Sequence, residues 1–211
     1  KGLQRNGLSL VGVLGLSEQR SVRVSGYVSL ETTANRMEVP YAPFESINDP
    51  EVVALVRQWA PDVLFVVGLS QLVAPELLSL ARLGTVGFHP TALPQGRGRA
   101  PLAWLILDRQ RLSGAATFFE IDEGTDSGRI FVQEPFEVSE TDTAADVEQS
   151  MLQAIDRALD RWLPDLARGE WAPIEQDPSL ATYYGKRTPA DGWIDWESPA
   201  EEILRLIQAC G

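Results

Sequence analysis

Short apolar runs alternate with helical patterns along the middle of the chain, and this alternation narrows the choice of fold. Residues 62–67 (DVLFVV) are nearly all apolar, as expected for a strand that is covered on both faces of a sheet. Before them, Asn48 or Asp49 can cap a helix and Pro50 suits its first turn. Further strands are expected at 85–89, 115–121 and 129–135, and helices at 75–82, 101–109 and 141–160. The pattern predicts an α/β fold with a doubly wound, mostly parallel sheet.

The N-terminal residues fit this pattern less well. Residues 1–6 have the character of a helix end, Gly7 fits the position just after it, and residues 8–14 predict a buried strand. Because an α/β domain usually begins with a strand, we expect a first strand upstream of Lys1. Residues 17–39 are polar and irregular, which indicates a surface loop.

The composition changes again after residue 164. Residues 169–197 are rich in turn formers and aromatic residues, and a helix is expected from Pro199 to about Ala209. The aromatic residues are Trp171, Tyr183, Tyr184, Trp193 and Trp196. We expect the last four to pack this segment onto the sheet rather than to stack on a ligand. The sequence thus predicts a main domain over residues 1–168, and over 169–211 a short aromatic-rich C-terminal extension, or a linker toward a further domain.

Composition excludes several classes of protein. Of the 211 residues 44% are hydrophobic and 23% charged, which allows a real core and excludes a disordered chain. No apolar run approaches the roughly 20 residues that cross a bilayer, so no membrane partner is expected. The single cysteine, Cys210, allows neither an internal disulfide nor a cysteine-based zinc site, and no metal site is predicted. A reducing, cytoplasmic compartment is the expectation.

Charge and histidine content limit the chemistry further. The chain has 18 Lys and Arg against 30 Asp and Glu, a formal net charge of −12. Nucleic-acid binding over the whole surface is therefore not expected, although a local basic groove stays open. The only histidine in the sequence is His89, so any imidazole chemistry would depend on it.

The densest group of reactive and turn-forming residues is the segment 87–101 (GFHPTALPQGRGRAP). It leaves a predicted strand and enters a predicted helix, where ligands bind in open α/β sheets. His89 can act as a general acid or base near neutral pH, and Arg97 and Arg99 can hold an anion. The alternative is that His89 is an ordinary polar residue and that the arginines are solvated loop charges.

A second loop, residues 122–128 (DEGTDSG), lies between two predicted strands. Loops at adjacent strand ends can bring His89 and Asp126 together, and the carboxylate would then orient the imidazole ring. The spacing alone leaves it equally open that the two side chains lie apart.

Three motifs that follow one another along the chain allow a comparison with one known protein family. The motifs HPTALP from His89, RGRAPLAW from Arg97 and DEGTDSGRI from Asp122 resemble those of the 10-formyltetrahydrofolate-dependent formyltransferase family. The stretch YGKRTPADGWIDW from Tyr184 is similar to the segment after the catalytic domain in the methionyl-tRNA and aminosugar branches. The resemblance extends from about Pro61 onward. It implies a Rossmann-like fold and a formyltransferase catalytic domain over residues 1–168.

The resemblance implies transfer of a formyl group from N10 of the folate to a primary amine. The family uses an asparagine, a histidine and an aspartate, and His89 and Asp126 match the last two. The histidine would handle protons and help to hold the oxyanion, while the aspartate fixes its orientation and charge. Expected contacts to the folate are Val67, Gly68, Leu69, Asp122, Glu123 and Gly124. Expected contacts to the second substrate are Thr91, Arg97 and Arg99.

The sequence departs from the family at one catalytic position. The family's asparagine lies two residues before the histidine, where this chain has Gly87. Loss of one oxyanion donor typically costs about 10²–10³ in rate. Either Thr91, Ser70 or Gln71 compensates, or the reaction differs, or catalysis has been lost. Because the rest of the motifs is intact, we favour compensation.

The acceptor is expected to be small, such as an aminosugar nucleotide or an amino-acid-type or antibiotic-type amine. The negative net charge favours this choice, as does a chain that stops where the tRNA-binding domain of the tRNA branch would begin. Three other readings stay open: a methionyl-tRNA formyltransferase, a hydrolase of formyltetrahydrofolate, and a folate-binding protein with impaired catalysis. The sequence does not indicate an oligomeric state.

Overall fold

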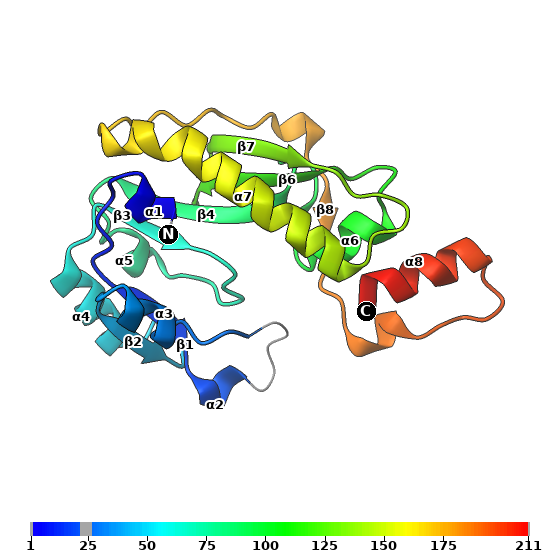
Figure 1. The fold of residues 1–211 in the computed structure, drawn as a ribbon, viewed down its shortest axis with the longest axis horizontal. Coiled ribbons are helices and arrows are strands. Elements are labelled where there is room, and N and C mark those ends of the chain that lie inside the picture. Colours follow the sequence, from blue (N-terminus) through cyan, green and yellow to red (C-terminus); the bar gives the residue numbers. More distant parts are fainter. Residues whose placement is uncertain (1, 22–26, 211) are drawn as a thin grey trace. The chain divides into compact units, whose positions relative to one another are not determined.

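The computed structural model describes residues 2–21 and 27–210 and divides into two compact units (Figure 1). The first comprises Leu3–Val86, and the second comprises Gly2 and the chain from Gly87 onward. This division falls within a strand, whereas the sequence predicts a boundary after residue 168. That predicted boundary stays a prediction.

The first unit contains a two-stranded parallel sheet. Strand β1 (Val13–Leu16) pairs with β2 (Tyr41–Phe44), with Val13 opposite Tyr41. The strand predicted at 8–14 begins later. The reason is that Gly7, at φ 77°, ends the short helix α1 (Gly2–Arg5) and the chain then turns back, with Leu8 N–H donating to the Leu3 carbonyl.

The predicted loop at 17–39 is wrong for two of its described parts. Helix α2 spans Glu18–Ser21 and α3 spans Glu31–Arg36, while residues 22–26 of this segment lie outside the described residues. Both helices are too short for a periodic pattern. In α3 the buried face consists of Ala34 alone, so its sequence does not differ from that of a polar loop.

The remaining elements of the first unit follow the sequence pattern closely. Helix α4 (Pro50–Trp59) begins after Asp49 and ends at Ala60, which is left-handed at φ 47°. Strand β3 is Val63–Val66, and α5 (Pro75–Leu78) is shorter than the predicted 75–82. The buried core of this unit consists of Phe44, Ile47, Val52, Val53, Val56 and Leu77.

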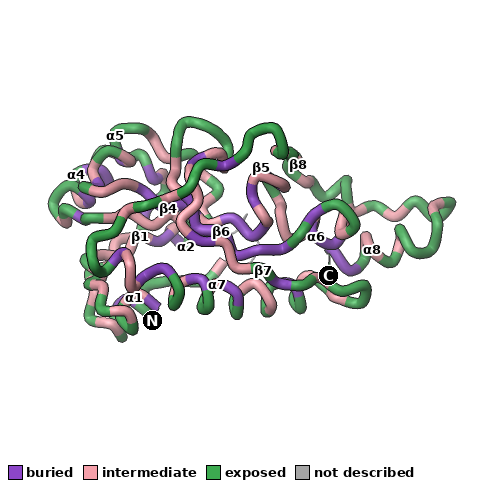
Figure 2. Tube along the Cα trace, turned by 90° about the horizontal axis from the view of Figure 1, so that it is seen from above, coloured by how far each residue is buried: buried purple, intermediate pink, exposed green. Residues whose placement is uncertain are grey.

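The longest strand, β4 (Gly84–Thr91), begins in the first unit and ends in the second, and in the strand order of its sheet it lies between β3 and β6 (Gly114–Glu120). Strand β6 pairs antiparallel with β7 (Ile130–Phe136). Helix α6 (Pro101–Leu107) follows the loop after β4. Strand β6 is buried along all but its last residue, which makes it a centre of the second unit's core (Figure 2). The predicted α/β fold class is confirmed.

Helix α7 (Ala144–Ala167) lies along β6 and β7 (Figure 1). It extends beyond the predicted end at residue 160 because Trp162, Leu163 and Leu166 continue its buried face. Thr143 and Asp146 form a capping box at its N-terminus, in which each side chain meets the other residue's backbone N–H.

Replacing Thr143 by alanine is expected to lower the free energy of unfolding by about 1 kcal/mol at neutral pH. Hydrogen bonds from the Thr143 hydroxyl and backbone N–H lower the pKa of Asp146. A lowered carboxyl pKa adds stability above the usual carboxyl range, and that stability is lost as the pH falls through the folded-state pKa. The difference between variant and parent should therefore shrink in acid, which urea unfolding at neutral and acidic pH would measure.

Thr141→Ala is the matched control, because this exposed threonine contacts Ser139 and precedes the cap. It is expected to change stability by less than about 0.5 kcal/mol. An equal loss for Thr143→Ala at both pH values would show that the ionised Asp146 adds nothing to the cap.

The C-terminal segment contains elements that the sequence does not predict. Strand β8 (Tyr183–Tyr184) pairs in parallel with β5 (Arg97–Gly98). Two 3-10 helices, η1 (Pro178–Leu180) and η2 (Pro189–Gly192), precede the predicted final helix, α8 (Ala200–Cys210). Among the described residues, no helix has the length and apolar character that a membrane crossing requires.

The aromatic residues of this segment divide into packed and exposed ones. The Trp171 ring lies 4.6 Å from that of Phe131, and the Tyr184 ring 5.2 Å from that of Trp104. Trp193 and Trp196 are 79% and 76% exposed, and Tyr183 is 64% exposed. The expectation that all four tail aromatics pack onto the sheet is therefore wrong for three of them. Trp193 directly follows η2, and the Tyr183 hydroxyl accepts a hydrogen bond from Arg97.

Candidate active site

His89 lies near the end of β4 and contacts two loops of the second unit. Its side chain is 6% exposed. The ring atom Nε2 is 2.8 Å from the carbonyl oxygen of Gly96, and Nδ1 is 3.5 Å from Oδ2 of Asp126. The structure thus brings together the two residues that the sequence proposes as catalytic.

Both ring nitrogens of His89 face hydrogen-bond acceptors. A carbonyl oxygen can only accept, so Nε2 donates to Gly96. An ionised carboxylate also only accepts, so Nδ1 meets Asp126 as a donor when it carries a proton. Because Nε2 is committed to Gly96, Nδ1 and Asp126 are the atoms of this pair that face each other and could exchange a proton with a substrate.

Asp126 is held by its own loop and by the loop before α6. Its backbone is left-handed at φ 50°, and its Oδ2 accepts from the backbone N–H of Gly98 at 2.8 Å. Within its loop, Asp122 accepts from the Gly124 N–H and the Ser127 hydroxyl, both at 2.9 Å. A left-handed aspartate needs such support, because this conformation is costly for residues with a side chain.

Gly98 can reach Asp126 because it has no side chain. Its φ is 117°, and a Cβ there would collide with the carbonyl oxygen of Tyr184. Residues with a side chain avoid this conformation, so glycine is required for the N–H to point at the carboxylate.

Two of the three predicted acceptor-binding residues are buried with protein partners. Thr91 is fully buried and donates to the Gln95 carbonyl at 2.7 Å. Arg97 is 3% exposed, and its guanidinium donates to Gln176 and to the Tyr183 hydroxyl. These contacts favour structural roles for both side chains. Arg99 is exposed, so its charge is available to a ligand.

The six predicted folate contacts lie in two segments. Asp122, Glu123 and Gly124 are exposed in the second unit, on the loop that carries Asp126. Residues 67–69 follow β3 in the first unit, where Val67 is 56% exposed and Leu69 packs partly against the core. Folate binding by either segment stays a prediction.

Two apolar side chains border the position of the missing asparagine. A Cβ at Gly87 would lie 2.9 Å from Cζ of Phe119 and 3.0 Å from Cγ1 of Ile121. The three residues proposed to compensate give little support. Thr91 is committed to Gln95, the Gln71 side chain binds the backbone of Glu45 and Ile47, and Ser70 is an exposed residue of the first unit.

Restoring the asparagine with Gly87→Asn is expected to destabilise the protein by about 1–3 kcal/mol and to bring no gain in rate. The new side chain would displace Phe119 or Ile121. Denaturant unfolding and turnover would measure both effects. Gly185→Asn is the control, because a Cβ there meets no atom within 4 Å. A Gly87→Asn protein that is as stable as the parent and faster would show that only the amide had been missing.

The side chain of Tyr184 helps to attach the C-terminal segment to α6. Its hydroxyl donates to Asp108 at 2.7 Å, and burial together with this bond raises the pKa of Tyr184 to about 12. The hydroxyl therefore keeps its proton and donates at neutral pH. The Trp104 indole donates to the Gly185 carbonyl at 2.9 Å.

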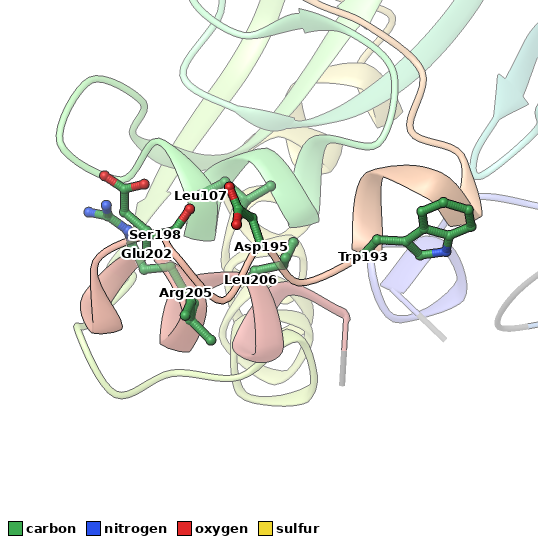
Figure 3. A pocket seen from close by; sticks show the side chains of 8 residues that line it. Leu107, Trp193, Asp195, Ser198, Glu202, Arg205 and Leu206 are labelled. Carbon is green, nitrogen blue, oxygen red and sulfur yellow. The ribbon is translucent and has the colours of Figure 1, made fainter.

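A surface pocket of about 370 Å³ lies elsewhere in the second unit (Figure 3). It is lined by Leu107, Trp193, Asp195, Ser198, Glu202, Ile203, Arg205 and Leu206. None of the predicted catalytic or binding residues lines it. It is therefore not the site that His89 and Asp126 form.

Sequence reasoning missed Gln176, whose side chain contacts both loops of the site. Gln176 lies in a polar stretch without periodicity, so no pattern pointed to it. The only indication was the family resemblance of the segment that begins a few residues later, at Tyr184.

Known proteins share this fold. The family model described as formyl transferase matches residues 12–163. A 4-N formyltransferase from Francisella tularensis is 18% identical at a TM-score of 0.75, covering 99% of this chain and 81% of that one. The N-formyltransferase from Helicobacter canadensis, solved with folinic acid and dTDP-3-aminofucose, is 18% identical at a TM-score of 0.72, covering 99% and 74%.

HypX from Aquifex aeolicus, solved with tetrahydrofolic acid, is 17% identical at a TM-score of 0.71. The match covers 94% of this chain but only 34% of HypX, so the chain spans about a third of that protein. At such identities the likeness to solved structures establishes the fold.

Proposed function

Because the chain belongs to the formyl transferase family, as its motifs predict, we propose that it is an enzyme that transfers a formyl group from 10-formyltetrahydrofolate to a primary amine. The observation that carries this proposal is the pair of His89 and Asp126, 3.5 Å apart, between two loops of the second unit. An imidazole and a carboxylate at this distance can move the proton that amine attack releases.

The loop of Asp126 fits a folate as formyl donor. Its exposed residues 122–124 offer backbone donors and acceptors to the amide-like edge of a pterin, within the same loop as the catalytic carboxylate. When bound, the folate supplies the formyl group on its N10 nitrogen. Two proteins of the same fold were solved with folates, which supports this donor.

The hydrogen bonds of His89 support a proton transfer through Asp126. Since Nε2 is used by the Gly96 carbonyl, the exchangeable edge is Nδ1 with Asp126, whose side chain is 19% exposed. Asp126 is thus the more open of the two to an incoming amine. The pair can take the proton that the amine loses as its bond to the formyl carbon forms. It can return that proton to N10 as the N10–carbon bond breaks.

We propose a small acceptor, either an aminosugar nucleotide or an amino-acid-type or antibiotic-type amine. The exposed Arg99, next to the Gly98 that binds Asp126, offers a positive charge to an anionic group of such a substrate. The sugar nucleotide in the Helicobacter canadensis structure supports this class. The net charge of −12 disfavours a large polyanion such as tRNA.

The test combines the protein with 10-formyltetrahydrofolate and a panel of amines. The panel contains aminosugar nucleotides, amino acids, methionyl-tRNA and an arm without amine. Tetrahydrofolate release is followed, and products are identified by mass. A formyl group gained by one small amine is the expected result. A formylated methionyl-tRNA would overturn the small acceptor. Release without a formylated amine would indicate hydrolysis, and binding without release a folate-binding protein; either would overturn the proposal.

A further inference from the structure

We propose that Gln176 is a positioning residue of the active site, because its amide ties the loop of Asp126 to the loop of Arg97. The kinetic consequence rests on the proposed formyl transfer, while the structural consequence does not. Gln176 lies in the C-terminal segment, about 50 residues beyond Asp126, and is 9% exposed.

The nitrogen of the Gln176 amide holds the backbone that carries Asp126. Its Nε2 donates to the carbonyl of Asp126 at 2.9 Å and to that of Gly128 at 2.6 Å. One contact is to Asp126 itself and the other lies two residues further on, so both support a left-handed backbone that is costly for a residue with a side chain. The Gln176 amide therefore helps to set where the Asp126 carboxylate lies relative to His89.

The oxygen of the same amide holds the other loop. Its Oε1 accepts from Nη2 of Arg97 at 2.7 Å and from Nε at 3.3 Å. The two neighbours of Arg97 in the chain make the site's backbone contacts. Gly96 accepts from His89, and Gly98 donates to Asp126. Gln176 thus acts on both partners of the pair through a single side chain.

The groups that surround the Gln176 side chain explain why a glutamine suits this position. A guanidinium only donates and a carbonyl only accepts, so the amide oxygen must face Arg97 and the nitrogen must face the two carbonyls. A side-chain amide offers an acceptor and a two-proton donor on separate atoms, and asparagine is one methylene shorter than glutamine. Two backbone hydrogen bonds between Ile130 and Ile174, both of 2.8 Å, fix the chain just before Gln176.

The test uses Gln176→Glu, which keeps the shape and the acceptor for Arg97 but places an oxygen against two carbonyls. Gln176→Met removes both halves of the amide without adding a charge, in case the first variant fails to fold. Gln208→Glu is the matched control. Gln208 is 8% exposed, its amide donates to the Glu140 carbonyl at 3.0 Å, and that contact involves no residue of the proposed site.

The first readout needs no activity. Because His89 is the only histidine in the sequence, its ring gives one set of ¹⁵N and ¹³C NMR signals. At fixed pH both Gln176 variants should shift these signals, and the control should not. The second readout is kinetic: kcat should fall on the order of 10–100-fold in the Gln176 variants, with KM for the amine little changed.

Ring signals that stay unchanged in a folded Gln176 variant would overturn the inference, as would an equal shift in Gln208→Glu. A parent protein without formyl transfer would contradict the proposed function, and the NMR comparison would still decide the role of Gln176.

Discussion

Asp126→Asn is expected to lower kcat for formyl transfer by about 10²–10⁴-fold while the protein stays folded. Asparagine has the shape of aspartate, and its oxygen can still accept from Gly98, which now donates to Oδ2 at 2.8 Å. It carries no charge and cannot take a proton at neutral pH. The Nδ1 edge of His89 therefore loses the group with which it shares the amine's proton.

The measurement is kcat with the amine that the panel identifies, beside circular dichroism of the folded variant. Asp62→Asn is the matched control. This carboxylate makes an exposed ion pair with Arg82 at 2.5 Å, and pairs of that kind contribute little. Parental turnover in Asp126→Asn would exclude the carboxylate from proton transfer and leave His89 to act alone.

General rules of α/β folds allowed His89 and Asp126 to meet but left it equally open that they lie apart, and their proposed catalytic roles came from the family resemblance. His89 lies near the end of β4 and Asp126 follows β6, two strands that are visible as apolar runs, and loops at neighbouring strand ends converge. The helix α4 was equally visible, because Asp49 and Pro50 mark its start.

The contacts that hold His89 and Asp126 in place could not be predicted from the sequence in the same way. Strands β5 and β8 have two residues each, too few for a period, and they join positions 86 residues apart, as in the contact of Arg97 with Tyr183. The filling of the space at Gly87 by Phe119 and Ile121 is also a tertiary contact. From the sequence, Gly87 is a missing donor, whereas in the structure its position is also packed.

Backbone groups of the loop before α6 therefore do much of the work of positioning His89 and Asp126. Beyond their contact with each other, the side chains of His89 and Asp126 contact backbone groups, the Gly96 carbonyl and the Gly98 N–H. Backbone groups can fix the positions of His89 and Asp126 only if the loops that carry these groups are themselves fixed by other contacts. That dependence is the reason to expect large effects from the contacts of the C-terminal segment as well as from the pair itself.

His89→Gln is expected to reduce kcat by about 10²–10⁴-fold. The glutamine amide can replace Nε2 as a donor to Gly96, a contact of 2.8 Å, so the loop keeps its anchor. An amide cannot accept and return a proton at neutral pH, so the exchange with Asp126 is lost. The measurement is single-turnover formyl transfer, which reports the chemical step without product release.

The double variant His89→Gln/Asp126→Asn distinguishes a joint role from two separate roles. If the pair handles one proton between Nδ1 and Oδ2, either substitution alone removes that step, and the double variant should be hardly slower than the slower single variant. Rate losses that multiply would mean that each residue stabilises the reaction independently. Their distance of 3.5 Å would then reflect packing rather than shared proton transfer.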